Sequence, residues 1–211
     1  CFNLTLSEID SVLAQLGIAY VDLLMLHGPS EAFGHEGPCS DFSCALNAAQ
    51  WQAYAAALSA KKVRAIGVSN FCASCLECLA KQTDGPVPAA NQLQLHVGMG
   101  ADPGELMTYN AQRGIVVQAY EPLAGGEVVT DCPVCSQVGA AYNKSAAQVG
   151  LRWVLDRVPS LAVKTGSQAH LEQDLEMWNG WSLSRDDRAK LDALTEPEGE
   201  AGGRCSWGCT E

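Results

Sequence analysis

The sequence predicts an α/β fold in which parallel strands alternate with helices. Short apolar runs of strand length alternate about five times with segments of helical periodicity, which is the pattern of a parallel sheet. Polar residues directly follow these runs, at the strand ends where barrel folds carry their site residues. A complete (β/α)8 barrel of the TIM type needs about 250 residues, and this chain has 211. We therefore expect an incomplete barrel of about five βα units.

The chain opens with a predicted helix and strand. Apolar residues at helical spacing predict the helix, which Thr5 or Ser7 caps and which Gly17 ends. The apolar run 21–26 predicts a buried strand, with His27 at its carboxyl end.

A long loop and the second βα unit follow. Residues 28–44 are rich in Gly, Pro and Ser, which predicts a loop, and the alanine-rich segment 51–58 predicts a helix. The compact apolar run 65–68 predicts a strand. Ser69 and Asn70 come directly after it, where a parallel strand delivers polar groups to the mouth of the fold.

The same reasoning applies to the rest of the chain, where Gly and Pro separate the periodic segments. The clearest long helix is expected over 138–157, and Ser184 caps the last helix. The predicted elements are, in order, helix 72–82, strand 89–95, helix 103–113, strand 115–119, a Gly/Pro loop over 121–131, helix 138–157, strand 161–163, and helices 171–178 and 185–194. Residues 1–196 are predicted to form the partial barrel, and residues 197–211 a Gly-rich tail.

Charge and hydropathy limit the classes of partner. The formal net charge is −11 and the sequence pI is about 4.7, which argues against nucleic acid and against an anionic membrane surface. No apolar run reaches the ~18 residues of a membrane span. We expect a cytoplasmic protein by default. Because the sequence begins at Cys1, a processed organellar protein is the alternative.

The ten cysteines allow several interpretations. Cys72, Cys75 and Cys78 have the spacing of a metal site, but no fourth ligand is nearby, so no metal is predicted. A local disulfide is considered at Cys132-Pro-Val-Cys135, or between Cys205 and Cys209, in an oxidising compartment. Otherwise most of these thiols are expected to be small buried hydrophobes.

Several motifs in a fixed order resemble the aldo-keto reductases, from about Leu6 to Glu196. The segments that carry the resemblance are Leu16 to Leu23, Leu26 to Pro29, Lys62 to Phe71, Asn91 to His96, Gly114 to Leu123 and Lys144 to Trp153. The resemblance implies reduction of small carbonyl compounds with NADPH.

The resemblance also implies roles for individual residues. Ser69, Asn70 and Gln92 correspond to the hydrogen-bond partners of the nicotinamide carboxamide, and Tyr120 to the ring that stacks on the nicotinamide. The remaining correspondences are Lys164 and Thr165 at the 2′-phosphate of NADPH, and His27 at the catalytic histidine that orients the substrate.

The chain departs from the family's pattern in two ways. Glu121 stands where the family usually has a serine near the pyrophosphate, and His170 replaces an arginine on the adenine side, so weakened cofactor binding is expected. The catalytic Asp, Tyr and Lys of the family belong to its first three strands, which this sequence lacks.

Two functions are therefore weighed. The first is an aldo-keto reductase-like oxidoreductase by ancestry, with doubtful activity in this chain. The alternative is a pseudoenzyme, a non-catalytic reductase-derived subunit of a larger assembly. In either case the open sheet edges require a cover, which we expect to be N-terminal residues missing from this sequence, a second copy, or a protein partner.

Overall fold

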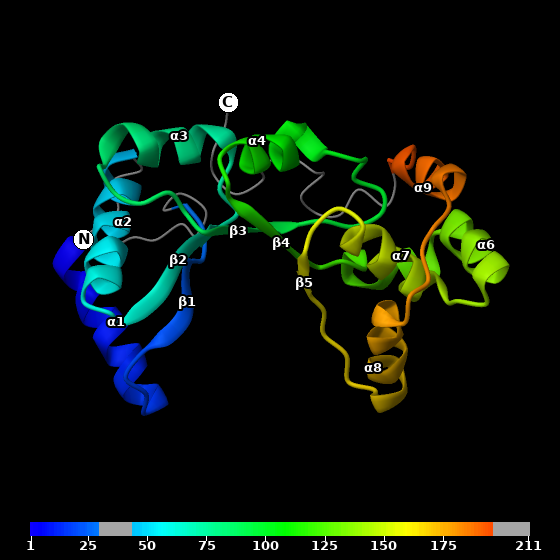
Figure 1. Ribbon diagram of the computed structural model, residues 1–211, viewed down its shortest axis with the longest axis horizontal. Helices are drawn as coiled ribbons and strands as arrows, with labels where there is room; N and C mark the ends of the chain where they lie inside the picture. Colours follow the sequence, from blue (N-terminus) through cyan, green and yellow to red (C-terminus); the bar gives the residue numbers. More distant parts are fainter. Residues whose placement is uncertain (30–43, 196–211) are drawn as a thin grey trace. The chain divides into compact units, whose positions relative to one another are not determined.

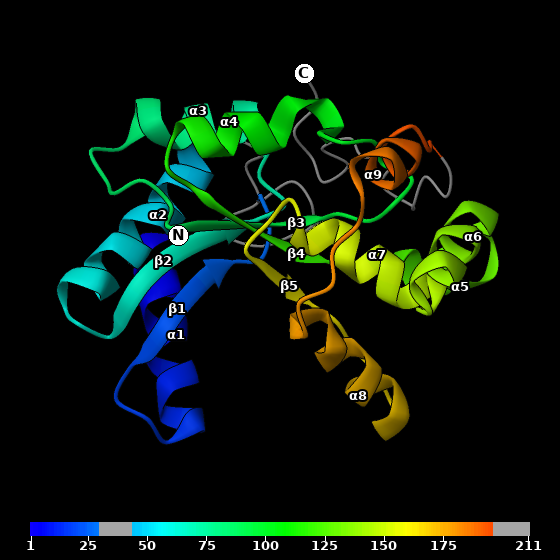
Figure 2. The same ribbon diagram turned by 45° about the vertical axis from the view of Figure 1, so that its right-hand side comes forward.

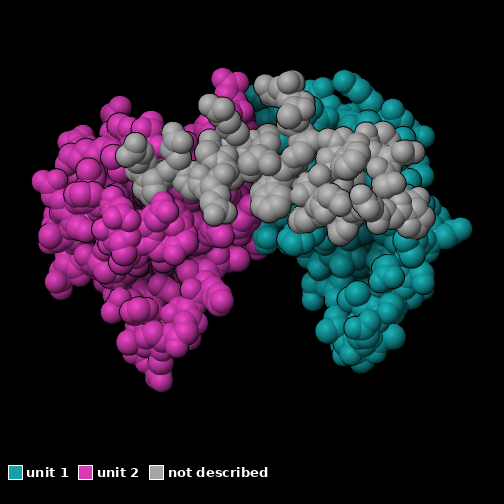
Figure 3. All heavy atoms as spheres, turned by 180° about the vertical axis from the view of Figure 1, so that it is seen from behind, with its two compact units in different colours: residues 1–92, 109–116, 205–211 teal, residues 93–108, 117–204 magenta. Residues whose placement is uncertain are grey.

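The computed structural model describes residues 1–29 and 44–195. Figure 1 shows their helices and strands in chain order. The chain divides into two compact units, which are coloured separately in Figure 3. Of the described residues, unit 1 contains 1–29, 44–92 and 109–116, and unit 2 contains 93–108 and 117–195.

The described residues contain five strands, which follow one another in the sheet in chain order. Strand β1 pairs with β2, β2 with β3, and β4 with β5, and all three pairs are parallel. Their bounds are β1 (Val21–Leu26), β2 (Val63–Ser69), β3 (Ala90–Gln94), β4 (Val116–Tyr120) and β5 (Ser160–Ala162). The predicted α/β class and the alternation of strands with helices are thereby confirmed, while the eight-unit barrel stays a prediction.

Unit 1 packs helices against β1 and β2. Its helices are α1 (Phe2–Leu16), α2 (Cys44–Ser59), α3 (Ala73–Gln82) and residues 109–112 of α4 (Leu106–Gln112). Helix α2 contacts α1, α3 and β2, as Figure 2 also shows. The core of this unit is built around Trp51, Ile66 and Phe71, whose side chains are almost completely buried. Burial of large apolar groups such as these stabilises the unit.

Unit 2 is built around α7 (Ala146–Leu155). Trp153, Val149 and Val154 of this helix are fully buried among the apolar residues of β4, α6 and α9. The other elements of the unit are η2 (Pro103–Glu105), η3 (Ala124–Gly126), α5 (Glu127–Thr130), α6 (Pro133–Tyr142), α8 (Gln168–Leu175), η4 (Glu176–Trp178) and α9 (Arg185–Asp192).

The predicted long helix over 138–157 is wrong, because the structure breaks it into α6 and α7. Asn143 adopts a left-handed backbone with a φ of 54°, which ends α6. Ser145 then caps α7 in a capping box with Gln148. The apolar periodicity continues through the break, so it conceals the boundary that these polar residues set.

Other boundaries also differ from the sequence-based expectations. Helix α1 begins at Phe2 rather than at Thr5 or Ser7, although Gly17 ends it as expected, with a φ of 67°. Residues 121–131 contain η3 and α5 instead of forming an irregular loop. Most of the predicted 28–44 loop and the predicted 197–211 tail lie outside the described residues.

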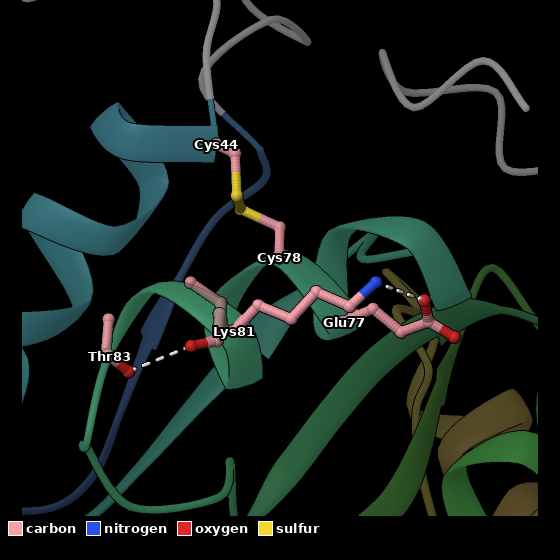
Figure 4. The surroundings of a disulfide bond; sticks show 6 residues. Cys44, Glu77, Cys78, Lys81 and Thr83 are labelled. Atoms are coloured by element: carbon pink, nitrogen blue, oxygen red, sulfur yellow. Dashed lines mark hydrogen bonds and ion pairs between the residues drawn. A yellow bond between two sulfur atoms is a disulfide. The ribbon is translucent and has the colours of Figure 1, made fainter.

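Disulfide bonds replace the free buried thiols expected from the sequence. Cys44 is bonded to Cys78, which joins α2 to α3 (Figure 4), and the considered local pair Cys132–Cys135 is confirmed. Every cysteine in the described ranges is disulfide-bonded: Cys1, Cys44, Cys72, Cys75, Cys78, Cys132 and Cys135. The expectation that most thiols are small hydrophobes is therefore wrong for this part of the chain.

None of the helices over 1–29 and 44–195 combines the length and the apolar character that crossing a membrane requires.

Candidate functional site

Four of the residues singled out in the sequence meet in unit 1, where β1 and β2 end beside the middle of β3. The Asn70 side-chain amide donates to the carbonyl oxygen of His27 at 3.1 Å and to Ser69 Oγ at 3.2 Å. Ser69 Oγ donates in turn to the carbonyl oxygen of Gln92 at 3.1 Å. The parallel register, in which Ser69 pairs with Gln92, explains why residues so distant in sequence lie together.

The backbone of Asn70 makes this arrangement possible. Its φ is 60°, in the left-handed region that asparagine tolerates better than most residues other than glycine. Its backbone N–H donates to the carbonyl oxygen of Gln92 at 2.9 Å, so the turn after β2 is hydrogen-bonded to β3. Ser69 is buried, whereas Asn70 is half-buried and His27 is exposed. The group therefore combines a buried, hydrogen-bonded serine with the more accessible side chains of Asn70 and His27.

Asn91 holds the residue that follows this turn, a role that the sequence analysis missed. Its side-chain amide donates to the carbonyl oxygen of Phe71 at 2.8 Å, and its side-chain oxygen accepts from the N–H of Phe71 at 3.4 Å. It also donates to Asn110 Oδ1 at 3.3 Å, and both asparagines are completely buried. A buried polar side chain that pairs with backbone groups fixes the local chain path, since losing its partners costs free energy. The sequence does contain one indication of this role, because Asn91 is a polar amide within the predicted buried strand 89–95.

In unit 2, Tyr120 ends β4 and lies next to β5. It pairs in register with Ala162, two residues before Lys164, and its carbonyl oxygen accepts from the N–H of Leu95 at 3.2 Å. Tyr120 is half-buried. The following residue, Glu121, is exposed and has a φ of 49°. A carboxylate therefore stands directly beside the aromatic residue singled out in the sequence.

Lys164 and Thr165 follow β5 and lead into α8. Lys164 is exposed and forms no ion pair with any residue that the structure describes. Thr165 Oγ1 accepts from the N–H of Ser167 at 3.2 Å, and Ser167 caps α8. His170 is exposed in the first turn of that helix. In the described part of the chain, the Lys164 ammonium thus has no ion-pair partner and lies just before the capped helix α8.

His96 is a second polar residue whose setting the sequence analysis did not predict. It is completely buried, and its Nδ1 lies 2.8 Å from the carbonyl oxygen of Val97. Burial lowers its pKa, against smaller raising contributions from the Val97 carbonyl, Glu121 and Glu127. We infer that His96 is a neutral structural residue at neutral pH.

The chemistry of the two groups differs. In unit 1, side-chain amides and a hydroxyl are suited to recognising another amide, because each provides directional donors and acceptors. In unit 2, an aromatic ring and a lysine are suited to a flat ring and a phosphate. Within the described ranges no three His, Cys, Asp or Glu residues form a group that could hold a metal ion.

Comparison with known proteins shows one family. The model described as Aldo/keto reductase family matches residues 5–196. The uncharacterized oxidoreductase YtbE of Bacillus subtilis (strain 168) is 30% identical over 192 residues, which cover 91% of this chain and 62% of that protein. The glyoxal reductase of the same organism is 30% identical over 197 residues, which cover 93% of this chain and 65% of that protein.

The fold comparison agrees. The crystal structure of an aldo/keto reductase from Brucella melitensis matches with a TM-score of 0.77 and 28% sequence identity, covering 90% of this chain and 67% of that one. The chain thus spans somewhat less than two thirds of the length of the two Bacillus relatives.

Proposed function

This chain belongs to the aldo/keto reductase family, and from that premise we propose that it binds NADPH and serves the reduction of small aldehydes or ketones. The observation that supports this most directly is the unit 1 group, in which Asn70 links His27, Ser69 and Gln92 where the parallel strands β1 and β2 end beside β3. Barrel enzymes place their site residues at such strand ends. The oxidoreductase names of the relatives support the same class of reaction.

Each residue has a proposed role that matches its chemistry. Ser69, Asn70 and Gln92 hold the carboxamide of the nicotinamide, because amides and hydroxyls offer it both donors and acceptors. Tyr120 stacks on the nicotinamide ring. When bound, NADPH supplies the hydride that reduces the carbonyl carbon. His27, which is exposed at the end of β1, orients the carbonyl substrate.

Lys164 and Thr165 are proposed to bind the 2′-phosphate of NADPH. The observation that fits this role is the exposed Lys164 ammonium, which has no acidic partner in the described ranges. An unpaired ammonium binds phosphate as a point charge. Glu121 opposes the binding of an anionic cofactor, and His170 offers less positive charge than an arginine would, so we expect moderate affinity. The residues with proposed roles do not include a proton donor.

The test is isothermal titration calorimetry of the purified chain with NADPH and with NADH, which lacks the 2′-phosphate. We expect Lys164→Gln to weaken NADPH binding about tenfold, because a charged hydrogen bond is lost, and to leave NADH binding unchanged. Lys190→Gln is the matched control, since Lys190 is an exposed lysine of the same unit on α9. It should change neither affinity.

Either of two results would contradict the proposal. Absence of NADPH binding at millimolar concentration would reject cofactor binding by this chain and would leave the non-catalytic alternative. Equal losses of NADPH and NADH affinity in Lys164→Gln would reject the assignment of Lys164 to the 2′-phosphate.

A further inference from the structure

Unit 1 contains a cavity of about 530 Å³ that the proposed cofactor residues do not line. Its walls come from α3, from the segment 83–88 and from residues 109–115. The segment 83–88 precedes β3, and Ile115 precedes β4, so the cavity belongs to the amino ends of these strands. The Asn70 group, in contrast, stands at the carboxyl ends of β1 and β2. The volume lies within the range of roughly 300–1,000 Å³ that is usual for small-molecule sites.

The cavity has apolar walls that are held in place by hydrogen bonds. Trp51, which is almost completely buried, donates from Nε1 to the carbonyl oxygen of Pro86 at 3.0 Å. Thr83 Oγ1 donates to the carbonyl oxygen of Leu79 at 3.0 Å and accepts from the N–H of Gly85 at 3.2 Å. A Cβ on Gly85 would lie within about 3.3 Å of both the Trp51 ring and Thr83, so glycine permits this close approach. The walls are therefore preformed.

Helix α3 is also fixed at its outer side. The Cys44–Cys78 disulfide joins it to α2 (Figure 4), and Cys78 directly precedes the cavity residue Leu79. Val87, in contrast, keeps 62% of its surface exposed although it is a large apolar residue. An exposed apolar wall on a preformed cavity is a feature of binding sites rather than of packed cores.

The rim of the cavity carries more positive than negative charge. Lys81 and Arg113 contribute two cations, and Glu77 contributes one carboxylate, which pairs with Lys81 at 3.2 Å (Figure 4). The Arg113 guanidinium lies 3.5 Å from the centre of the Tyr109 ring and donates to the Tyr109 carbonyl oxygen at 3.4 Å. Among the described residues Arg113 has no carboxylate partner. A net positive rim is notable on a chain of net charge −11.

We propose that this cavity binds a small aromatic carboxylate. Its ring would lie against the apolar walls near Trp51 and Val87, where burial of apolar surface and ring contacts stabilise it. Its carboxylate would pair with Arg113, because the planar guanidinium matches a carboxylate with two parallel hydrogen bonds. Stacking on Tyr109 holds the guanidinium in place, which lowers the entropy lost on binding.

The first test uses 2-naphthoate and its uncharged analogue 2-naphthylmethanol, titrated calorimetrically into the whole chain. We expect 2-naphthoate to bind about tenfold more tightly than the alcohol, and Arg113→Gln to abolish that difference while leaving the affinity for the alcohol nearly unchanged. Arg64→Gln is the matched control, because Arg64 is also an exposed arginine of unit 1 over a tyrosine ring, that of Tyr20. It should retain the full preference for the carboxylate.

A second variant tests the walls. Ala80 is an exposed helical residue that lines the cavity, so Ala80→Trp should fill the cavity without disturbing the fold and should weaken both probes at least tenfold. Circular dichroism verifies that each variant is folded. Unchanged binding in Ala80→Trp, or an equal carboxylate preference in Arg113→Gln and wild type, would overturn the proposal. Failure of 2-naphthoate to bind at millimolar concentration would overturn it as well.

Discussion

Two hydrogen bonds set the tautomer of His96, and burial lowers its pKa. With Nδ1 donating to the Val97 carbonyl oxygen, Nε2 is left to accept from the Gln94 side-chain amide at 3.3 Å. A second proton would place an N–H opposite that amide donor inside the core. Both the lost hydrogen bond and the desolvation of the charge oppose protonation, in agreement with the lowered pKa.

This setting makes stability depend on pH. Because the folded pKa of His96 lies below the unfolded value of about 6.5, the unfolded state binds more protons in the interval between them. The free energy of unfolding should therefore have its full value above pH ~6.5. It should fall as the pH drops from the unfolded pKa of His96 to the folded one. Urea unfolding between about pH 7.5 and 5 measures this, and His96→Gln, which does not titrate, should show a smaller slope. An identical slope would assign the effect to other groups.

The positions of site residues could be predicted where the sequence next to them determines the local structure. The placement of Ser69 and Asn70 at a strand end follows from the apolar run before them, and the structure brings them together with Gln92 and His27. The hydrogen bonds from Asn91 to Phe71 were not predictable, because Phe71 lies in the turn after the neighbouring strand and the register was unknown. The functional roles of the four site residues of unit 1 stay predictions, as do those of Tyr120, Lys164 and Thr165.

At the scale of secondary structure, the disulfide between α2 and α3 closes a long segment of chain. Its cysteines are 34 residues apart, whereas Cys132 and Cys135 are three apart. A longer closed loop restricts the unfolded chain more strongly. We expect Cys44→Ala/Cys78→Ala to lower the free energy of unfolding by about 2–4 kcal/mol in urea titrations.

Cys132→Ser/Cys135→Ser provides the comparison. Its loop is short, and a serine at position 132 keeps an acceptor for the first turn of α6, so a smaller loss is expected. If the short pair proved more important than the long one, loop closure would not be the source of the stabilisation.

Element type was predictable from periodicity, but element ends were less so. The helix–strand alternation depends on apolar spacing, which is local, and Ser184 was identified as the cap of α9 from its type and position. The break between α6 and α7 was missed because the apolar periodicity continues through it. The left-handed Asn143 and the capping box decide the backbone there. Propensity is a weak signal beside such specific hydrogen bonds.

At the scale of the whole molecule, charge is the dominant property. The chain has 24 acidic and 13 basic side chains, and its net charge of −11 produces self-repulsion in the folded state. We expect the Tm at pH 7.5 to rise by a few degrees, roughly 2–4 °C, when NaCl increases from about 10 to 200 mM, since screening weakens this repulsion. Differential scanning calorimetry measures the shift.

The control is the same comparison near the sequence pI of about 4.7. With net charge close to zero, NaCl should then give no increase, because it screens attractions as much as repulsions. An equal increase at both pH values would indicate a salt effect that is unrelated to net charge.

The two deeply buried tryptophans have an optical consequence. Trp51 lies in the core of unit 1, and Trp153 lies in the core of unit 2, where its Nε1 donates to Asp192 at 2.8 Å and Arg157 stacks on its ring. An indole shielded from water emits at shorter wavelength than an exposed one such as Trp178. Each unit thus contains its own emission reporter, and replacing Trp51 or Trp153 by phenylalanine would reveal in which order the two cores admit water.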